Sequence, residues 1–195
     1  MKNNSYSSIA LLGTSADPPT IGHKILLTEL SKIFPKVVTW ASDNPSKSHK
    51  TSLNQRYELL NTLVEAIALP NLELKQELSS KWAIKTLERA AKHWPNKGLI
   101  LIIGSDLVTD IPHWFEAKNV LQHAQLGIVP REGWPIGNSN LEKIKEMGGT
   151  PILLPLKIPE TASSTIHNHL LFSQIPKALL PILKKKNLYG LSQKM

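Results

Sequence analysis

Short apolar runs alternate along the chain with longer segments in which apolar residues recur every three or four positions. The short runs lie at residues 9–12, 37–41, 72–74, 99–103, 125–129 and 152–154, and such unbroken runs are typical of strands buried in a parallel sheet. The longer segments predict helices near residues 25–33, 53–69, 82–94, 114–121 and 141–147, followed by two short helices at about 164–172 and 176–185. Strands and helices are therefore predicted to alternate.

This alternation predicts an α/β fold, a doubly wound parallel sheet with right-handed crossovers and helices on both faces. The chain has 195 residues, which is enough for one well-buried core, and no internal repeat or low-complexity linker divides it. We therefore expect a single domain over residues 1–195, whose helical C-terminal portion covers about 160–195.

The polar segment from Gly13 to His23 lies between the first predicted strand and the first predicted helix. In an open α/β sheet this junction is at the carboxyl end of a strand and the amino end of a helix, where backbone N–H groups and the helix dipole favour anions. The loop at residues 42–51 and the segment Gly104–Asp106 each follow another strand in the same way. These three segments predict a phosphate-binding site.

Charge and composition narrow the classes of partner. Lysine and arginine exceed the acidic residues by eight, which fits a nucleic-acid surface, a membrane surface or a pocket for a polyanionic small molecule. Nearly all of the excess is lysine, whereas base readers favour arginine, so nucleic acid is not the expected partner. There is no cysteine, which excludes disulfides and cysteine chemistry. The polar N-terminus and short apolar runs predict a cytoplasmic protein without a membrane span.

The segment from Gly13 to His23 resembles the signature of the nucleotidyltransferase superfamily, Gly-x-Phe-Asp-Pro followed by His or Thr, x, Gly and His. Asp17-Pro18 and Gly22-His23 match, and Thr20 stands where histidine is commoner. The chain is similar over nearly its whole length to the nicotinate-nucleotide adenylyltransferase family. Its matching segments are Asn44–Lys47 with Arg56, Lys81–Leu87, Ile103–Asp106 with Trp114, Val129–Gly133, and Asn187–Tyr189.

The closing motif departs from that family. Relatives carry Ser-Ser/Thr-Thr-x-Ile-Arg, whereas this chain reads Ser163-Ser164-Thr165-Ile166-His167-Asn168 without a nearby arginine. A fixed positive charge on the ATP phosphates is therefore lost or becomes dependent on pH, and Lys47 or Lys50 is the candidate replacement.

The resemblance implies a Rossmann-like nucleotidyltransferase fold and transfer of the adenylyl group from ATP to nicotinate mononucleotide in NAD synthesis. His23, Thr20 and Lys47 are expected to be catalytic, with His23 hydrogen-bonding the phosphates and, when protonated, neutralising them. The residues expected to bind ATP and its phosphates are Gly13, Thr14, Ser15, Gly22, Gly104, Asp106, Ser163, Ser164 and Thr165. Those expected to bind the mononucleotide are Thr86, Trp114 and Arg131. No residue is expected to hold a metal, because Mg²⁺ would bridge the phosphates of the substrate.

Several of these residues also have an ordinary structural explanation. Thr20 is a favoured helix N-cap residue, Gly13 fits a turn, Asp106 fits a cap, and a tryptophan such as Trp114 mostly serves packing. Other functions also remain open: nicotinamide mononucleotide or another phosphorylated acceptor such as phosphopantetheine as substrate, a nucleotide-binding relative without catalysis, or a nucleic-acid-binding protein. The sequence also leaves open whether the chain forms a homo-oligomer.

Overall fold

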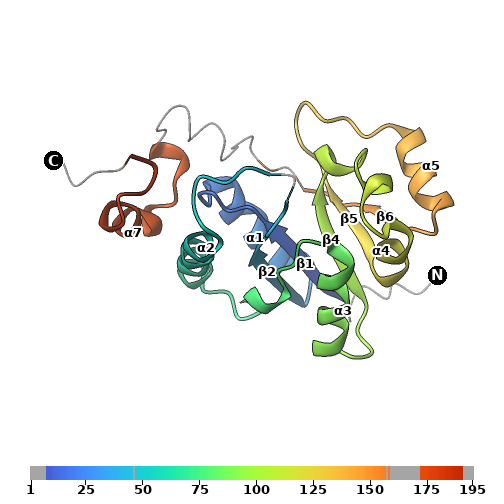
Figure 1. Ribbon diagram of the computed structural model, residues 1–195, viewed down its shortest axis with the longest axis horizontal. Helices are drawn as coiled ribbons and strands as arrows, with labels where there is room; N and C mark the ends of the chain where they lie inside the picture. Colours follow the sequence, from blue (N-terminus) through green and yellow to red (C-terminus); the bar gives the residue numbers. More distant parts are fainter. Residues whose placement is uncertain (1–7, 46, 157, 159–171, 191–195) are drawn as a thin grey trace.

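Six parallel strands form one sheet in the computed structural model of the chain, which describes residues 8–45, 47–156, 158 and 172–190 (Figure 1). The order across the sheet is β3-β2-β1-β4-β5-β6. The strands are β1 Ile9–Thr14, β2 Lys36–Ala41, β3 Leu72–Leu74, β4 Leu99–Gly104, β5 Gln125–Val129 and β6 Pro151–Leu153. This order, with all pairs parallel, confirms the predicted doubly wound sheet.

Helices connect the strands where the periodicity predicts them, although several of their ends differ from the predicted ones by up to four residues. The α-helices are α1 Ile21–Ile33, α2 Leu53–Ile67, α3 Ala83–His93, α4 Ala117–His123, α5 Asn138–Glu146 and α7 Leu180–Lys185. The helix expected at 114–121 begins only at Ala117, so the expectation that Trp114 is helical was wrong. Glu116 has a φ of 54°, which a helix interior does not allow, and the helix therefore begins after it.

The two faces of the sheet are covered by different helices, as alternation along β1 shows. Ala10 and Leu12 belong to a core cluster with residues of α1, α2 and α7, whereas Ile9 and Leu11 belong to a second cluster with residues of α3, α4 and α5. Successive residues of a strand therefore pack against opposite helical layers. Because both faces of the sheet are buried, the strands are continuous apolar runs in the sequence.

The ladder between β1 and β4 ends before the strands do. Their pairing stops at Leu11 and Leu101, while β1 continues to Thr14 and β4 to Gly104. β1 and β4 are also where the strand order reverses, because the chain proceeds from β1 to β2 and β3 on one side and from β4 to β5 and β6 on the other. In such sheets this switch point, at the carboxyl ends of the strands, is the general position for a ligand.

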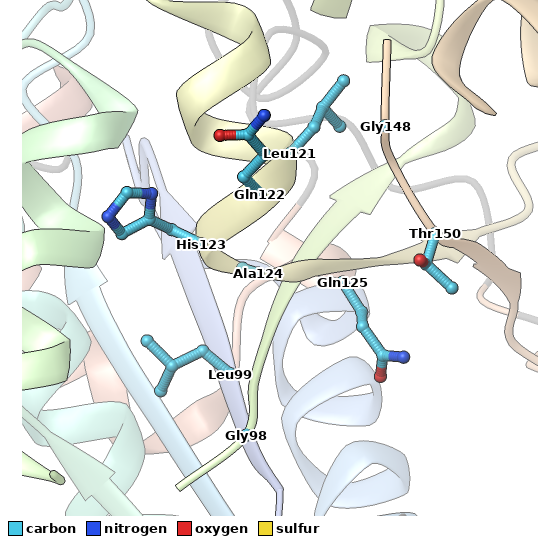
Figure 2. A pocket seen from close by; sticks show the side chains of 9 residues that line it. All are labelled: Gly98, Leu99, Leu121, Gln122, His123, Ala124, Gln125, Gly148 and Thr150. Carbon is cyan, nitrogen blue, oxygen red and sulfur yellow. The ribbon is translucent and has the colours of Figure 1, made fainter. Parts of the chain in front are cut away.

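A hollow of about 410 Å³ lies at the opposite end of the sheet (Figure 2). It is lined where β4 and β5 begin, by Leu99 and Gln125, and by His123 at the end of α4. None of the residues predicted to bind ATP or the mononucleotide lines this hollow. Within the described part of the chain, no helix is long and apolar enough to cross a membrane.

Candidate functional site

Thr20 and His23 hold the start of α1 in a reciprocal cap. The Thr20 side chain accepts from the His23 amide, and the Thr20 amide donates to His23 Nδ1 at 3.0 Å. The N-cap role expected for Thr20 is thereby confirmed. Gly22 lies between them and is buried. This capping box leaves the first turn of α1 directed towards the end of β1, where an anion would meet it.

The same bonds fix the proton on the His23 ring. A backbone N–H can only donate, so Nδ1 is the acceptor and the proton of the neutral ring is on Nε2, which lies 2.8 Å from Thr14 Oγ1. Burial, and the charges of Arg131 and Lys47, lower the pKa of His23 to about 4. In the ligand-free protein at neutral pH, His23 is therefore an uncharged N–H donor.

Gly13 is required by the packing of β1 on β2. A Cβ atom at this position would lie 2.8 Å from two carbon atoms of the Trp40 ring, which is itself buried. Gly13 also pairs directly with Trp40 across the ladder. The glycine thus lets the indole cover the end of β1, so the structure gives it a packing role independent of any phosphate.

Asp17 joins the loop after β1 to the loop after β2. Its side chain is 3% exposed and accepts from the Lys50 amide at 2.6 Å and from the Thr51 hydroxyl at 2.7 Å. His49 Nδ1 lies 3.7 Å from the same carboxylate, but burial and the nearby Arg56 lower the His49 pKa, so this contact is not an ion pair at neutral pH. The Asp17–Pro18 peptide bond is cis.

Arg56 of α2 hydrogen-bonds the backbone of the segments that follow β1 and β2. It is 2% exposed, and its Nη1 donates to the carbonyl of Ser15 at 2.9 Å and to that of Ser42 at 2.7 Å. It therefore reaches from α2 to the residues that follow β1 and β2. The arginine matched to the family motif is a scaffold residue of the site, with its guanidinium already engaged by backbone carbonyls.

Arg131 crosses the end of β4 to reach Asp106. Its Nη1 lies 3.1 Å from Asp106 Oδ2, and its amide donates to the Ser105 hydroxyl at 2.9 Å. A Cβ at Gly104 would lie 2.6 Å from Arg131 Nε and 2.2 Å from Asp106 Oδ1. Gly104 thus provides the space in which the two side chains meet, beside the switch point.

The structure brings most of the predicted phosphate-binding residues to one end of the sheet. Thr14 ends β1 and Ser15 follows it, His23 lies in the first turn of α1, Gly104 ends β4 and Asp106 follows it, and Arg131 follows β5. Lys47 is exposed on the loop after β2, and its charge and that of Arg131 act on His23. Ser163, Ser164 and Thr165, with the helix expected at 164–172, lie outside the described residues.

Two residues predicted to bind the mononucleotide, Thr86 and Trp114, differ in their burial. Thr86 is 3% exposed, and its hydroxyl donates to the Leu78 carbonyl at 2.9 Å. Trp114 packs partly buried against the second core cluster. The neighbouring exposed rings are instead Trp82 and Phe115, whose centroids lie 4.9 Å apart.

Sequence reasoning missed the residues that connect the loops. Asp17 was quoted only as part of a motif, and Tyr189 only as part of a terminal Leu-Tyr pair, yet the Tyr189 hydroxyl donates to Asp17 Oδ1. No local pattern predicts this contact, because 172 positions separate the two residues. The apolar Leu188 beside Tyr189, which is buried in the core, was the only available signal that this end of the chain returns to the domain.

Unsatisfied polar atoms gather around these loops. The described residues leave five buried side-chain polar atoms without a partner, and four of them belong to Ser15, His49, Arg56 and Asp106. Each such atom costs about 1–3 kcal/mol unless a ligand or water meets it. Among the described residues, no group of three or more His, Asp or Glu side chains is placed to hold a metal ion. The arrangement suits a polar ligand that supplies hydrogen-bonding groups to these atoms.

Comparisons with known proteins agree on one family. The family model described as cytidylyltransferase-like matches residues 11–168. A Synechocystis protein called "Probable nicotinate-nucleotide adenylyltransferase" is 36% identical over 151 residues, covering 72% of this chain and 76% of the relative. A Clostridium tetani protein of the same name is 26% identical and covers 92% of this chain and 98% of the relative.

The fold is shared with a solved structure from Plasmodium falciparum. This nicotinic acid mononucleotide adenylyltransferase, complexed with NaAD, matches with a TM-score of 0.78 and 20% identity, covering 97% of this chain and all of that one. A second structure of the Plasmodium protein, complexed with APC, matches with a TM-score of 0.76. The match extends over the sheet and both helical layers.

Proposed function

The chain belongs to the cytidylyltransferase-like family and to the nicotinate-nucleotide adenylyltransferases, and we propose that it transfers the adenylyl group of ATP to nicotinate mononucleotide. The products are nicotinate adenine dinucleotide and pyrophosphate. The observation that carries the proposal is the gathering of Thr14, His23 and the charged Arg131 at the switch point, within a family that performs this reaction. Its place in the cytoplasm and its single-domain organisation stay predictions.

The reaction needs no protein nucleophile. An oxygen of the mononucleotide phosphate attacks the α-phosphorus of ATP in line, a new P–O bond forms, and the bond to the bridging oxygen breaks as pyrophosphate leaves. The second pKa of a phosphate monoester is about 6, so the attacking group is mostly dianionic at neutral pH and requires no strong base. Catalysis therefore rests on positioning and on stabilisation of charge.

His23 and Thr14 supply the donors at the α-phosphate in this proposal. Nε2 of His23 carries the proton and lies beside the Thr14 hydroxyl, so the pair forms a preorganised donor group at the end of β1. When ATP binds, the negative phosphates raise the pKa of His23, because opposite charge favours the protonated ring. The proposed contact thus strengthens as charge accumulates on the leaving pyrophosphate.

Cationic residues complete the proposed phosphate site. Arg131 and Lys47 both act electrostatically on His23, which supports a role for each near the phosphates. Ser15 offers a buried hydroxyl without a partner, and Asp106 an unpartnered carboxylate oxygen for a sugar hydroxyl. Mg²⁺ is proposed to enter with ATP as part of the substrate and to offset phosphate charge there. Phosphate contacts by Ser163, Ser164 and Thr165 remain predictions outside the described residues.

The proposal is tested by pyrophosphate release from ATP and Mg²⁺ with nicotinate mononucleotide and nicotinamide mononucleotide offered separately. We expect turnover with nicotinate mononucleotide and formation of nicotinate adenine dinucleotide in equal amount. ATP without acceptor measures background hydrolysis, and the His23→Asn variant controls for contaminating enzymes. Preference for nicotinamide mononucleotide would overturn the acceptor, and no release with either would overturn the activity.

A further inference from the structure

Tyr189, near the C-terminus, contacts the buried carboxylate that connects the two phosphate-site loops. Its hydroxyl donates to Asp17 Oδ1 and lies 3.1 Å from Thr51 Oγ1, while Thr51 itself donates to the same carboxylate oxygen. The other oxygen of Asp17 accepts from the Lys50 amide. One carboxylate thus holds three segments: the loop after β1, the end of the loop after β2, and the C-terminal segment.

The backbone around Tyr189 is held in a conformation that these residues seldom adopt. Asn187 has a φ of 48° and Tyr189 a φ of 55°, both in the left-handed region, and Gly190 follows with a φ of 75°. A non-glycine residue in this region costs of order 1 kcal/mol and persists only where its surroundings impose it. In this conformation the Tyr189 hydroxyl contacts the Asp17 carboxylate.

Two further contacts keep the segment against the domain. Leu188 is 8% exposed and belongs to the core cluster shared with α1 and α2, and Lys186 forms an ion pair with Glu58 of α2. Figure 1 shows α7 beside α2, at the side of the sheet where β2 lies. Burial and the Asp17 carboxylate raise the pKa of Tyr189, so its hydroxyl stays a donor over the working range of pH.

We propose that Tyr189 is a positioning residue for ATP, because its hydroxyl, through Asp17, keeps the loops after β1 and β2 in their binding arrangement before ATP arrives. The part of this proposal that concerns ATP rests on the proposed function. Without the hydroxyl, the loops spend a smaller fraction of the time in the arrangement that binds ATP. The apparent affinity for ATP falls in proportion to that fraction. Once ATP is bound, its phosphates hold the loops themselves, so turnover of the bound complex changes little.

The test substitutes Tyr189→Phe, which keeps the ring and removes only the hydroxyl. We expect the KM and the Kd for ATP to rise about 10- to 150-fold, the range for a lost hydrogen bond to a charged group, with kcat within threefold of wild type. The matched control is Lys186→Ala, which loosens the same segment at its exposed ion pair and leaves Asp17 untouched. It is expected to change neither constant by more than twofold.

A second measurement is independent of catalysis. The Lys50 amide donates to Asp17, so its hydrogen exchange in the ligand-free protein reports the arrangement of the loops directly. We expect exchange at Lys50 to accelerate at least tenfold in Tyr189→Phe and to stay unchanged in Lys186→Ala. Thr51→Val should have the same effect as Tyr189→Phe, and combining the two should add little, because both act on one oxygen of Asp17.

The outcomes separate the two proposals. Unchanged Lys50 exchange and unchanged ATP affinity in Tyr189→Phe would overturn the positioning role, whatever the activity of the wild type. Equal effects of Tyr189→Phe and Lys186→Ala would reduce Tyr189 to a general stabiliser of the segment and overturn it as well. Faster Lys50 exchange in a protein whose wild type turns over neither mononucleotide would support the coupling and contradict the proposed function.

Discussion

His23 Nε2 donates across 2.8 Å to Thr14 Oγ1, and this bond connects the first turn of α1 to the last residue of β1. The other ring nitrogen accepts from the Thr20 amide. One side chain thus both caps the helix and supplies the donor next to the proposed α-phosphate. The structural and the catalytic contributions of His23 can be separated because they use different ring nitrogens.

Replacing His23 by asparagine keeps one of these contributions and removes the other. The Asn oxygen can occupy the place of Nδ1 and accept from Thr20, whereas no group remains at the position of Nε2. We expect kcat to fall about 10²- to 10³-fold, as for other preorganised donors. The free energy of unfolding should fall by about 1 kcal/mol, the typical net contribution of the lost bond to Thr14.

The control for this prediction is His23→Ala, which loses both contacts. Its kcat should fall by the same factor, and its free energy of unfolding should drop by about 1 kcal/mol more than that of His23→Asn, because the cap is lost as well. Steady-state kinetics and urea unfolding measure the two effects. If His23→Asn turned over within threefold of wild type, Nε2 would have no part in the reaction.

The lowered pKa of His23 makes stability depend on pH. The ring titrates at about 4 in the folded chain and at 6.5 in the unfolded chain, so the unfolded state binds more protons between these values. The contribution of the neutral His23 ring to stability is therefore fully present above pH 6.5, and it is lost as the pH falls towards 4. Between pH 7 and pH 5, we expect the free energy of unfolding of wild type to fall by about 2 kcal/mol more than that of His23→Asn.

Urea unfolding of both proteins at pH 7, 6 and 5 measures that difference. His49, whose pKa is lowered by burial and by Arg56, contributes in the same direction to both chains and cancels in the comparison. Parallel loss of stability in the two proteins would mean that His23 titrates near its ordinary pKa, and that the ring is charged in the ligand-free site at weakly acidic pH.

The sheet and the position of the site follow from local sequence patterns. Leu99–Ile103 predicted a central strand because burial on both faces leaves no polar position, and β4 is paired on both sides. Gly13 to His23 predicted an anion site because a polar turn between strand and helix exposes backbone donors. These inferences depend only on residues close in sequence, and the structure confirms the strand, the helix and the junction.

The contacts within the site depend on tertiary structure and were not predictable in the same way. The lowered pKa of His23 was not predicted, because it reflects burial and the charges of Arg131 and Lys47, which lie on other loops. Trp114 was wrongly placed in a helix because periodicity does not reveal the left-handed φ of Glu116. Arg56 was matched to a motif, but only the fold shows it beneath two loops.

Arg56 should be far more important for stability than an exposed arginine with similar bonds. Arg56→Met removes a buried cation, its bonds to Ser15 and Ser42, and the charge facing Asp17. We expect a loss of about 3–5 kcal/mol in the free energy of unfolding, typical of one partner removed from a buried charged network. Arg89→Met is the matched control, because Arg89 also donates to two carbonyls but is exposed.

Denaturant unfolding of the two methionine variants distinguishes their roles. Arg89→Met should lose less than about 1 kcal/mol, because water replaces its bonds at the surface. If Arg56→Met were as stable as Arg89→Met, the buried guanidinium would contribute no more than its surface counterpart, and the scaffold role assigned to Arg56 would be wrong.

Two glycines at the ends of neighbouring strands should respond differently to the same added methyl group. In Gly13→Ala the new Cβ meets the rigid, buried ring of Trp40 at 2.8 Å, so the core must shift, and we expect a loss of about 1–3 kcal/mol in stability. In Gly104→Ala it meets the movable side-chain atoms of Asp106 and Arg131, and the backbone conformation of Gly104 suits alanine. Stability should therefore change by less than about 1 kcal/mol.

The two substitutions should affect activity in the reverse order, with Gly104→Ala losing more than Gly13→Ala. Displacing Arg131 and Asp106 in Gly104→Ala removes their ion pair from the proposed nucleotide site, and we expect kcat/KM to fall about tenfold or more, the equivalent of one lost polar contact. Gly13→Ala should keep kcat/KM within about threefold when measured well below its unfolding temperature. Gly137→Ala controls for the substitution itself, since its Cβ would meet only ordinary contacts at 3.6 Å. Full activity of Gly104→Ala would show that the Arg131–Asp106 pair lies outside the working site, because the added methyl group cannot coexist with the pair as it stands.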